Sequence, residues 1–187
     1  PGEARDPAAW TRLLADEGVT VWNSVPALMQ MFADHAVGRP GPIAAGLRLV
    51  LLSGDWIPVT LPERVRGLAP RARLVSLGGA TEASIWSIEH PVDRVDPAWT
   101  SIPYGRPLAN QTIHVLDEAL EPCPEQVAGH LYIGGIGVAL GYLHDEERTR
   151  AAFLVHPSTG ERLYRTGDLG RFLAGGVVEF LGRADHQ

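Results

Sequence analysis

The 187-residue sequence has no lysine, so its sixteen basic residues are all arginine. A reaction that needs a lysine ammonium must therefore obtain it from outside this chain. Only one cysteine is present, Cys123, which excludes an internal disulfide framework and a cysteine-based zinc site. Because it lies between Pro122 and Pro124, we interpret it as an incidental surface thiol rather than a nucleophile.

Long apolar runs are also missing. None approaches the ~18 residues that cross a bilayer, and no basic stretch followed by an apolar one opens the chain. The net charge is −6 and the arginines are scattered, so a basic footprint for nucleic acid is lacking. The seven histidines show no spacing typical of metal ligands. We expect no membrane and no nucleic-acid partner, and a reducing, cytoplasmic setting.

What is present is typical of a globular chain. Hydrophobic residues make up 45% and charged residues 20%, and the 21 glycines and 15 prolines fall singly or in pairs between apolar runs, where they predict turns. The sequence begins at Pro1 without an initiator methionine and stops at Gln187 directly after GRADH. We interpret it as a fragment of a longer protein.

The first half alternates helix and strand patterns three times. Helices are expected in DPAAWTRLLADEG, PALMQMFADHA and LPERVRGLA, and apolar strands at Val19–Ser24, Leu47–Gly54 and Ala72–Gly79. This order predicts an α/β lobe over residues 1–100, in which helices cover both faces of a parallel βαβ-type sheet. Ligands of such sheets bind beyond the carboxyl ends of the strands.

The second half changes to short strands separated by turns. The strands are expected in QTIHVLD, GHLYIGG, ERLYRTGD, LGRFLA and GVVEFLG, with one helix in DEERTRAAFL. They predict a smaller, antiparallel β-barrel-like lobe over residues 101–187. The linker between the lobes is expected in HPVDRVDPAWTSIPYGRP.

The segment SLGGATEASIW follows an apolar strand and carries residues suited to chemistry. Gly78 and Gly79 would let the backbone approach a ligand, the Thr81 hydroxyl could bond a phosphate oxygen, and the Glu82 carboxylate could hold Mg²⁺. A glycine turn capped by the threonine explains the same residues equally well. Without a lysine, the segment is not a Walker-type phosphate loop.

The segment YRTGDLGRFLAGGVVEFLGRADHQ predicts a hairpin. A two-residue turn at 175–176 places Ala174 opposite Val177 and, further along, Asp168 opposite Arg183. The ordinary interpretation is a cross-strand ion pair. Alternatively, the carboxylate accepts hydrogen bonds from a vicinal diol such as ribose while the arginine supplies donors beside it.

A third segment, GHLYIGGIGVALGYL, runs from a strand into glycines. A dinucleotide-binding fingerprint would open a long helix in a βαβ unit, and this segment does not. We therefore expect turn-forming glycines here.

In order along the chain, GGATE, GHLYIGGIGVALGYL, YRTGDL and GRADHQ resemble successive core motifs of the adenylate-forming enzymes. The likeness is greatest to the amino-acid-activating adenylation domains of nonribosomal peptide synthetases, and it covers essentially the whole chain. It implies that ATP, with Mg²⁺, converts an amino acid to an aminoacyl adenylate and pyrophosphate. The aminoacyl group then passes to the phosphopantetheine thiol of a carrier-protein domain, with the C-terminal adenylation subdomain as a further partner.

The resemblance also implies roles for single residues. Thr81 would contact the adenylate phosphate and Glu82 would help to hold Mg²⁺. Asp168 would bind the ribose hydroxyls with Arg183 beside it. The remaining positions are an aromatic residue near the nucleotide, Phe180, the hinge residue Asp185, the loop glycines Gly78 and Gly79, and six pocket positions, Asn23, Leu51, Ser53, Leu77, Ile85 and Trp86.

The sequence departs from the family pattern in places. Adenylation domains usually have tyrosine, glycine and proline before the threonine-glutamate pair, but Gly78, Gly79 and Ala80 stand here, so the aromatic ring expected against adenine is missing. Leu140 stands where arginine is common. The phosphate loop, the aspartate for the substrate ammonium and the lysine-bearing C-terminal subdomain are not in this sequence, so the chain alone is expected to be inactive.

The pocket string N-L-S-L-I-W resembles a signature associated with cysteine. It describes a small pocket narrowed by Trp86, with weakly polar groups at Asn23 and Ser53, which suits a short polarisable thiol. Ordinary core and loop residues could match by chance, and an apolar pocket separates near-isosteres only weakly.

Other functions fit parts of the same pattern. An acyl- or aryl-acid CoA ligase shares the fold but binds no α-ammonium. A scaffold could retain the fold without chemistry. A nucleotide-binding oxidoreductase is disfavoured, because the glycine pattern lies in the wrong context.

Overall fold

The computed structural model describes residues 6–184, and the chain divides into two compact units. The first unit holds the residues up to Ser76 together with Pro91–Ile102. The second unit holds Leu77–His90 and the residues from Pro103 onward. The loop with the GGATE motif thus groups with the second half of the chain, whereas the sequence analysis assigned it to the first lobe.

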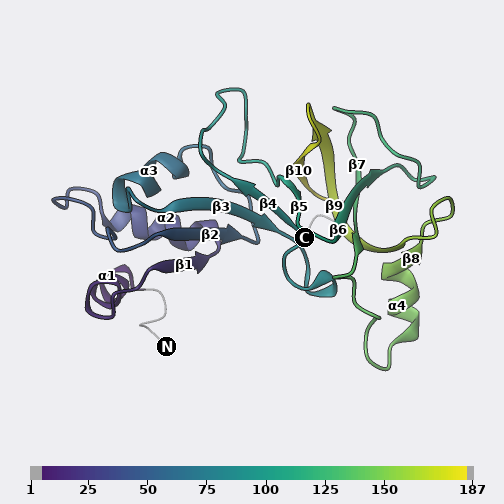
Figure 1. The fold of residues 1–187 in the computed structure, drawn as a ribbon, viewed down its shortest axis with the longest axis horizontal. Coiled ribbons are helices and arrows are strands. Elements are labelled where there is room, and N and C mark those ends of the chain that lie inside the picture. The colour runs from purple at the N-terminus through teal and green to yellow at the C-terminus, as the bar shows by residue number, and fades with distance from the viewer. Residues whose placement is uncertain (1–5, 185–187) are drawn as a thin grey trace. The chain divides into compact units, whose positions relative to one another are not determined.

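The helices and strands follow one another along the described residues as shown in Figure 1. The elements up to the third strand are α1 (Pro7–Asp16), β1 (Val21–Ser24), α2 (Pro26–His35), β2 (Leu49–Ser53), α3 (Leu61–Leu68) and β3 (Arg73–Gly78). They are followed by a 3₁₀ turn (Thr81–Ala83), β4 (Ile88–Pro91), β5 (Arg106–Pro107), β6 (Gln111–Leu116), β7 (Gly129–Gly135), α4 (Glu146–Ala152), β8 (Phe153–Val155), β9 (Arg162–Leu173) and β10 (Val177–Arg183).

The three helices of the first unit start where the sequence predicts. Asp6 caps α1, because its carboxylate accepts a hydrogen bond from the Ala8 amide at 2.9 Å. Both α2 and α3 have proline in their first turn, where the missing N–H costs nothing. The predicted alternation of three helices and three strands is confirmed.

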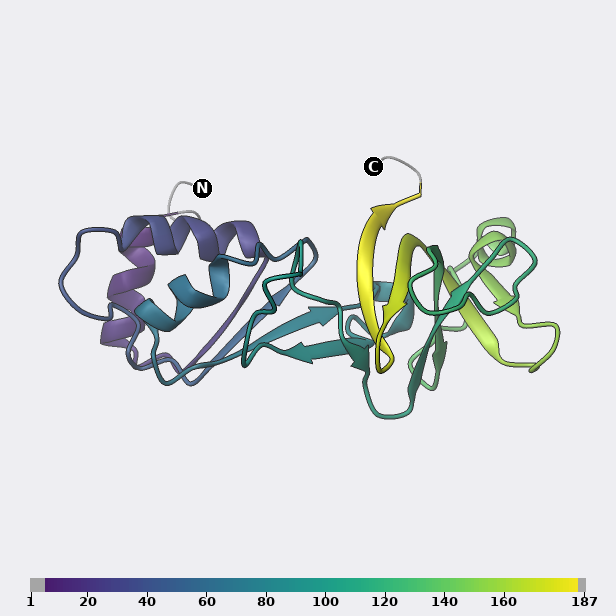
Figure 2. The same ribbon diagram turned by 90° about the horizontal axis from the view of Figure 1, so that it is seen from above.

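The strands of the first unit form a parallel arrangement with one covered face. β1 pairs with β2 from Val21 opposite Leu49 onward, and the Arg73 amide donates to the Arg48 carbonyl at 3.0 Å where β3 begins. Figure 2 shows α1, α2 and α3 on one face of these strands. Burial accordingly alternates along β1 and β2. The expectation of helices on both faces is therefore wrong for the described residues.

Aromatic packing anchors the covered face. The Trp22 ring stacks on Phe32, with centroids 5.1 Å apart, and Trp10 meets Trp22 edge-on at 5.5 Å. Phe32 is fully buried and lies in a cluster with β2 residues Val50 and Leu52. Offset and edge-on aromatic pairs stabilise by about 0.5–1.5 kcal/mol beyond their buried area. This cluster fixes α1 and α2 against the strands.

The second unit contains an antiparallel sheet with the strand order β10-β9-β7-β6, and β8 pairs with β9. The antiparallel pairing is as predicted. The path ends at β10 and β6, and no pairing among the described residues closes it into a barrel. β9 is one strand of twelve residues, where the sequence predicts two. Gly167 permits this continuity, because it adopts a φ of +79° within the strand.

The turn of the β9–β10 hairpin differs from the prediction by one residue. Val177 pairs with Leu173, so residues 174–176 form a three-residue turn. Gly175 and Gly176 have φ values of 78° and 77°, which glycine adopts at no steric cost. The prediction of a two-residue turn, with Ala174 facing Val177, is wrong.

A β-bulge between Phe180 and Gly182 shifts the register back by one residue. Beyond the bulge, Asp168 lies opposite Arg183, as the sequence predicts. The buried carboxylate of Glu179 and the Arg171 guanidinium, 2.6 Å apart, hold the register between turn and bulge.

Two short strands lie in or beside the predicted linker. β4 pairs with β5 through Ile88 opposite Pro107 and Glu89 opposite Arg106. Ile88 is almost fully buried. Each of these strands contains a proline, Pro91 in β4 and Pro107 in β5. Because proline is found in sheets mainly at edges, the sequence did not indicate strands here.

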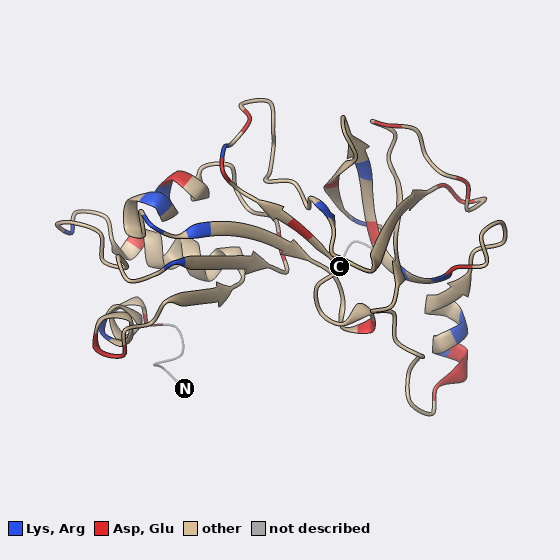
Figure 3. Ribbon diagram, in the orientation of Figure 1, with Lys and Arg blue, Asp and Glu red and all other residues tan. Residues whose placement is uncertain are grey.

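The helix α4 has charges arranged to suit its dipole, as Figure 3 shows. Asp145 caps it by accepting a hydrogen bond from the Arg148 amide at 2.9 Å. Glu146 and Glu147 lie in the first turn and Arg150 in the last. The predicted helix is longer than the observed one, because residues from Phe153 onward pair with β9 instead.

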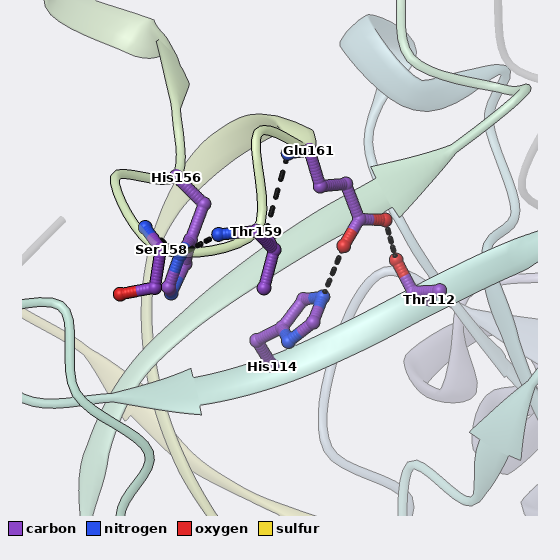
Figure 4. A network of polar contacts seen from close by, with 6 residues as sticks. All are labelled: Thr112, His114, His156, Ser158, Thr159 and Glu161. Carbon is purple, nitrogen blue, oxygen red and sulfur yellow. Dashed lines mark hydrogen bonds and ion pairs between the residues drawn. The ribbon is translucent and has the colours of Figure 1, made fainter.

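A polar network joins β6 to the loop before β9 (Figure 4). The Glu161 carboxylate accepts a hydrogen bond from the Thr112 hydroxyl at 2.6 Å and lies 2.9 Å from Nε2 of His114. Nearby, His156 is 5% exposed. Its Nδ1 accepts hydrogen bonds from the amides of Ser158 and Thr159 at 3.2 and 3.4 Å. The imidazole therefore satisfies the backbone of this turn.

This role of His156 predicts a specific stability change. Replacing His156 with alanine removes a buried ring and the shared acceptor of two amides, and should lower the free energy of unfolding by about 1–3 kcal/mol. His156→Asn supplies an amide oxygen in place of Nδ1 and should recover part of the loss. Urea unfolding of both variants measures this, and an equal loss in the two would contradict the role.

Candidate functional site

The GGATE loop begins where only glycine fits. Gly79 has a φ of +147°, and a Cβ there would lie 2.7 Å from the Ile85 carbonyl oxygen and 2.8 Å from the Ser87 amide nitrogen. The loop folds back on itself at this point, because the Ser87 amide donates to the Gly78 carbonyl at 2.8 Å. The fold of the loop thus requires glycine at position 79.

The residues after the glycines form a single 3₁₀ turn, Thr81–Ala83. Thr81 is exposed and Glu82 is half-buried. The Glu82 carbonyl accepts a hydrogen bond from the Ala139 amide at 2.8 Å, which ties the turn to the segment after β7. Thr81 and Glu82 thus stand on an anchored turn at the end of β3.

Two tyrosines surround the Glu82 carboxylate. The Tyr142 hydroxyl donates to Oε1 of Glu82 at 2.6 Å, and the Arg148 guanidinium lies 4.4 Å from the centre of the Tyr142 ring. Burial and then the bond to Glu82 raise the pKa of Tyr142. Burial and then the Glu82 charge also raise the pKa of Tyr164. Both phenols stay protonated at neutral pH and can donate.

Sequence reasoning missed Tyr142. It lies in the glycine-rich segment that was interpreted as turns, and its tyrosine-leucine pair after Gly141 was the only local signal. Glu82 and Tyr142 are sixty residues apart in sequence. Their contact is a product of tertiary packing.

The chemistry of Glu82 suits Mg²⁺. Mg²⁺ is usually held by one or two carboxylates together with substrate phosphates and water. Residues 6–184 contain no group of three or more His, Cys, Asp or Glu that could enclose a metal ion. Oε1 of Glu82 accepts a hydrogen bond from Tyr142, and the carboxylate keeps further lone pairs. These lone pairs could coordinate a Mg²⁺ ion that is also bound to a substrate phosphate.

The Asp168–Arg183 pair is formed as predicted. Nη1 of Arg183 lies 3.4 Å from Oδ1 of Asp168, whose side chain is 15% exposed. The Asp168 amide donates to the Thr166 hydroxyl at 3.0 Å, and that hydroxyl donates to the Leu131 carbonyl at 2.9 Å. These bonds fix the backbone at Asp168, and its carboxylate lies beside the Arg183 guanidinium.

The loop and the hairpin meet at one small cavity. Its volume is about 10 Å³, and it is lined by Gly79 of the loop and Thr166 and Asp168 of β9, with Tyr104, Ile88, Ile113, Leu131 and Ile133. Thr81 and Glu82 follow directly in the same loop. The structure thus brings the two segments singled out in the sequence together.

Phe180 also lies at this place. Its ring centroid is 5.1 Å from that of Tyr104. Burial, and then the Asp168 charge, raise the pKa of Tyr104, while Arg183 acts in the opposite direction. Sequence reasoning missed Tyr104, because it belongs to the segment predicted as a linker.

The six predicted pocket residues divide between the two units. Asn23 lies opposite Leu51 in the β1–β2 pairing, and Ser53 follows two residues later on β2. In the second unit, Leu77 is buried, Trp86 is half-buried and Ile85 is 63% exposed. The structure brings the first three together, and a shared pocket of all six stays a prediction. The predicted hinge residue, Asp185, lies outside the described residues.

Three other features of the chain bear on function. Burial, and then the Asp117 charge, raise the pKa of the Cys123 thiol, which makes it a poor nucleophile. Within residues 6–184 no helix has the length and apolar character to cross a bilayer. Leu140, at the position where arginine is common in adenylation domains, is 94% exposed.

Comparison with known proteins shows the family of the chain. The sequence profile of AMP-binding enzymes matches residues 1–143. Pyochelin synthetase PchF of Pseudomonas aeruginosa is 52% identical over 187 residues, which is 100% of this chain and 10% of that protein. The structure of the nonribosomal peptide synthetase FmoA3 in its α-methyl-L-serine-AMP bound form is 49% identical, with a TM-score of 0.94 over 100% of this chain and 21% of that one. PA1221, a nonribosomal peptide synthetase protein containing adenylation and PCP domains, is 31% identical, with a TM-score of 0.84 over 95% of this chain and 36% of that one.

The chain therefore belongs to the family of AMP-binding enzymes. More narrowly, it is a section of a nonribosomal peptide synthetase adenylation domain, as the four ordered motifs predict. It spans about a tenth of the length of the pyochelin synthetase that it matches.

The loop after Glu82 contains unusual backbone. Ser84 and Ile85 have φ values of 63° and 68°, in the left-handed region that β-branched residues avoid. The Ile85 amide donates to the Ala80 carbonyl at 3.0 Å, and the Ser84 hydroxyl donates to the Gly137 carbonyl at 2.9 Å. These bonds hold a strained conformation at a predicted pocket residue, and such strain costs about 1–3 kcal/mol per residue.

Relief of this strain is measurable. Ile85→Gly removes a largely exposed side chain and should raise the free energy of unfolding by about 1 kcal/mol. Val37→Gly is the matched control, since Val37 is 76% exposed and is not among the residues with positive φ. The control should lose stability in the same urea titration. A loss of equal size in both variants would show that Ile85 is not strained.

Proposed function

We propose that this chain forms the nucleotide-contacting part of an enzyme that activates an amino acid as its adenylate. The observation that carries the proposal is the small cavity lined by both Gly79 of the GGATE loop and Asp168 of the hairpin. The loop that would contact the phosphate and the aspartate that would contact the ribose therefore line the same cavity. FmoA3 is solved in an AMPPNP bound form and in an α-methyl-L-serine-AMP bound form, which supports an adenylating function for the protein to which this chain belongs.

Each residue has a part in the proposed reaction. A carboxylate oxygen of the amino acid attacks the α-phosphorus of ATP, the bond from that phosphorus to the bridging oxygen breaks, and pyrophosphate leaves with the electron pair. Asp168 would accept hydrogen bonds from the ribose hydroxyls, with Arg183 beside it. Thr81 would donate to the phosphate and Glu82 would hold Mg²⁺ against it.

The second step needs groups from outside the chain. The phosphopantetheine thiol of a carrier protein, as the thiolate, attacks the acyl carbon and releases AMP. PA1221 contains adenylation and PCP domains in one protein, which supports a carrier-protein partner here. The lysine expected to stabilise the reacting carboxylate is absent from this chain and would come from the C-terminal subdomain.

We further propose L-cysteine as the amino acid. Asn23 and Ser53 offer weakly polar groups, and Leu51 lies opposite Asn23 on the neighbouring strand. FmoA3 is solved in its α-methyl-L-serine-AMP bound form, and α-methyl-L-serine, like cysteine, is an amino acid with a short polar side chain. The named relatives are peptide synthetases, so they do not favour a CoA ligase.

The site assignment predicts losses in amino-acid-dependent ATP–pyrophosphate exchange by the full-length protein. Glu82→Ala and Asp168→Ala should each lower the rate roughly thirtyfold, because each removes a charged contact worth about 2 kcal/mol. Tyr142→Phe should give a smaller loss and a higher Mg²⁺ requirement. Glu146→Ala, whose side chain is 88% exposed, is the control and should leave the rate unchanged.

Two outcomes of this assay would count against the assignment. If Glu82→Ala and Asp168→Ala both exchange at the parental rate, the assignment of these two residues to the nucleotide site is wrong. Exchange by the 187-residue chain alone would show that the groups expected from outside it are unnecessary.

The pocket assignment predicts a preference for L-cysteine over serine, leucine and phenylalanine in the same exchange assay. Serine is harder to desolvate beside Leu77 and Trp86, and longer side chains would meet the indole. Valine and 2-aminobutyrate should compete, since such pockets separate near-isosteres by only about 1–3 kcal/mol. Trp86→Ala should admit longer apolar side chains. A stronger signal from serine, α-methyl-L-serine or an aromatic amino acid than from cysteine would reject the assignment.

A further inference from the structure

The GGATE loop lacks the aromatic residue that adenylation domains usually have before the threonine. Gly78 stands at that position and is buried. A Cβ on Gly78 would lie 2.7 Å from both Cδ2 and Cζ of Tyr104, and closer still to Cε2. Real Cβ atoms do not approach a ring this closely. The Tyr104 ring therefore occupies the space that a side chain at position 78 would need.

Tyr104 is held firmly in this place. The next residue, Gly105, exchanges two backbone hydrogen bonds with Val178 of β10, at 3.1 and 2.7 Å. The ring itself packs in a cluster with Ile88 and Val178 and contacts Phe180 at 5.1 Å. Backbone and side chain are thus both fixed to the hairpin that carries Arg183.

The ring also lies beside the candidate ribose contact. Tyr104 lines the same small cavity as Gly79 and Asp168. With a volume of about 10 Å³, this cavity is too small for a purine. A base attached to a ribose at Asp168 would therefore lie outside this cavity, and Tyr104, which lines it, is only partly buried.

We propose that Tyr104 supplies the aromatic surface for the adenine of ATP and replaces the ring that is missing at Gly78. The aromatic group has moved from the GGATE loop to the segment before β5. This inference rests on the proposed function, because it adds a positioning residue to the same nucleotide site.

The kinetic test uses ATP–pyrophosphate exchange by the full-length protein. Contact between a base and an aromatic ring is worth about 1–3 kcal/mol, so Tyr104→Leu should raise the KM for ATP roughly fivefold to a hundredfold. The KM for the amino acid should not change. Tyr104→Phe keeps the ring and should stay within about twofold of the parent. Phe172→Leu removes a ring from the same cluster and is the matched control, with an unchanged KM for ATP.

A ring exchange separates this role from simple space filling. Gly78→Tyr alone should impair folding or activity, since two rings cannot share the space. Gly78→Tyr combined with Tyr104→Ala restores the usual family arrangement and should recover the KM for ATP that Tyr104→Ala alone loses. Failure of the combined variant to recover, while it stays folded, would overturn the proposal.

Calorimetric titration with AMPPNP separates this inference from the proposed function. Weaker AMPPNP binding by Tyr104→Leu, with parental binding by Phe172→Leu, supports Tyr104 even if the parent shows no exchange and the proposed function fails. Parental AMPPNP affinity and parental KM for ATP in Tyr104→Leu overturn the inference and leave the proposed function intact.

Discussion

The pairing of β9 on both of its sides is the constraint on which the second unit depends. β7 pairs with one side of this strand between Tyr164 and Gly170, while β8 and then β10 pair with its other side. A strand paired in this way cannot slip by one residue without turning every side chain to the opposite face. Its register therefore decides three contacts at once, which are Asp168 opposite Arg183, Thr166 against the Leu131 carbonyl, and Tyr164 beside Glu82.

Two irregularities of the β9–β10 hairpin cancel, so that Asp168 still faces Arg183. Its turn contains one residue more than the simplest glycine turn, and the bulge before Gly182 compensates for that residue. Without the bulge, Asp168 and Arg183 would be displaced by one position. Bulges re-aim side chains near functional sites. The bulge lies between the ion pair of buried Glu179 with half-buried Arg171 and the open end of the hairpin at Arg183. The register near the turn therefore stays fixed, and the register at the open end is shifted by one residue.

The site is notable for its reliance on phenols and glycines. Tyr142 holds the Glu82 carboxylate, and Tyr104 packs where Gly78 has no side chain. Each pairing joins a small or acidic residue of one loop to a ring from another segment. Because an aromatic ring is rigid, it holds the loop residue that it contacts in one position. The chain contains no lysine that could do so by charge. In the proposed function, this chain supplies the contacts to the nucleoside and the Glu82 carboxylate that would hold Mg²⁺. The lysine ammonium that the reaction needs would come from outside the chain.

The sequence by itself determined the element order of the first unit, the Asp6 cap and the family. It also predicted that Asp168 faces Arg183, but from a two-residue turn, whereas in the structure a three-residue turn and a bulge together give this facing. These predictions follow from signals that are local or fixed in motif spacing, such as apolar periodicity and turn glycines. The structure alone decided the one covered sheet face, the pairing of β4 with β5, the bulge, and the partners Tyr142 and Tyr104. These contacts join segments far apart in the chain, as in the sixty residues between Glu82 and Tyr142, and such contacts leave no periodic trace in the sequence. They exist because the folded backbone brings a hydroxyl to a carboxylate and a ring to a glycine.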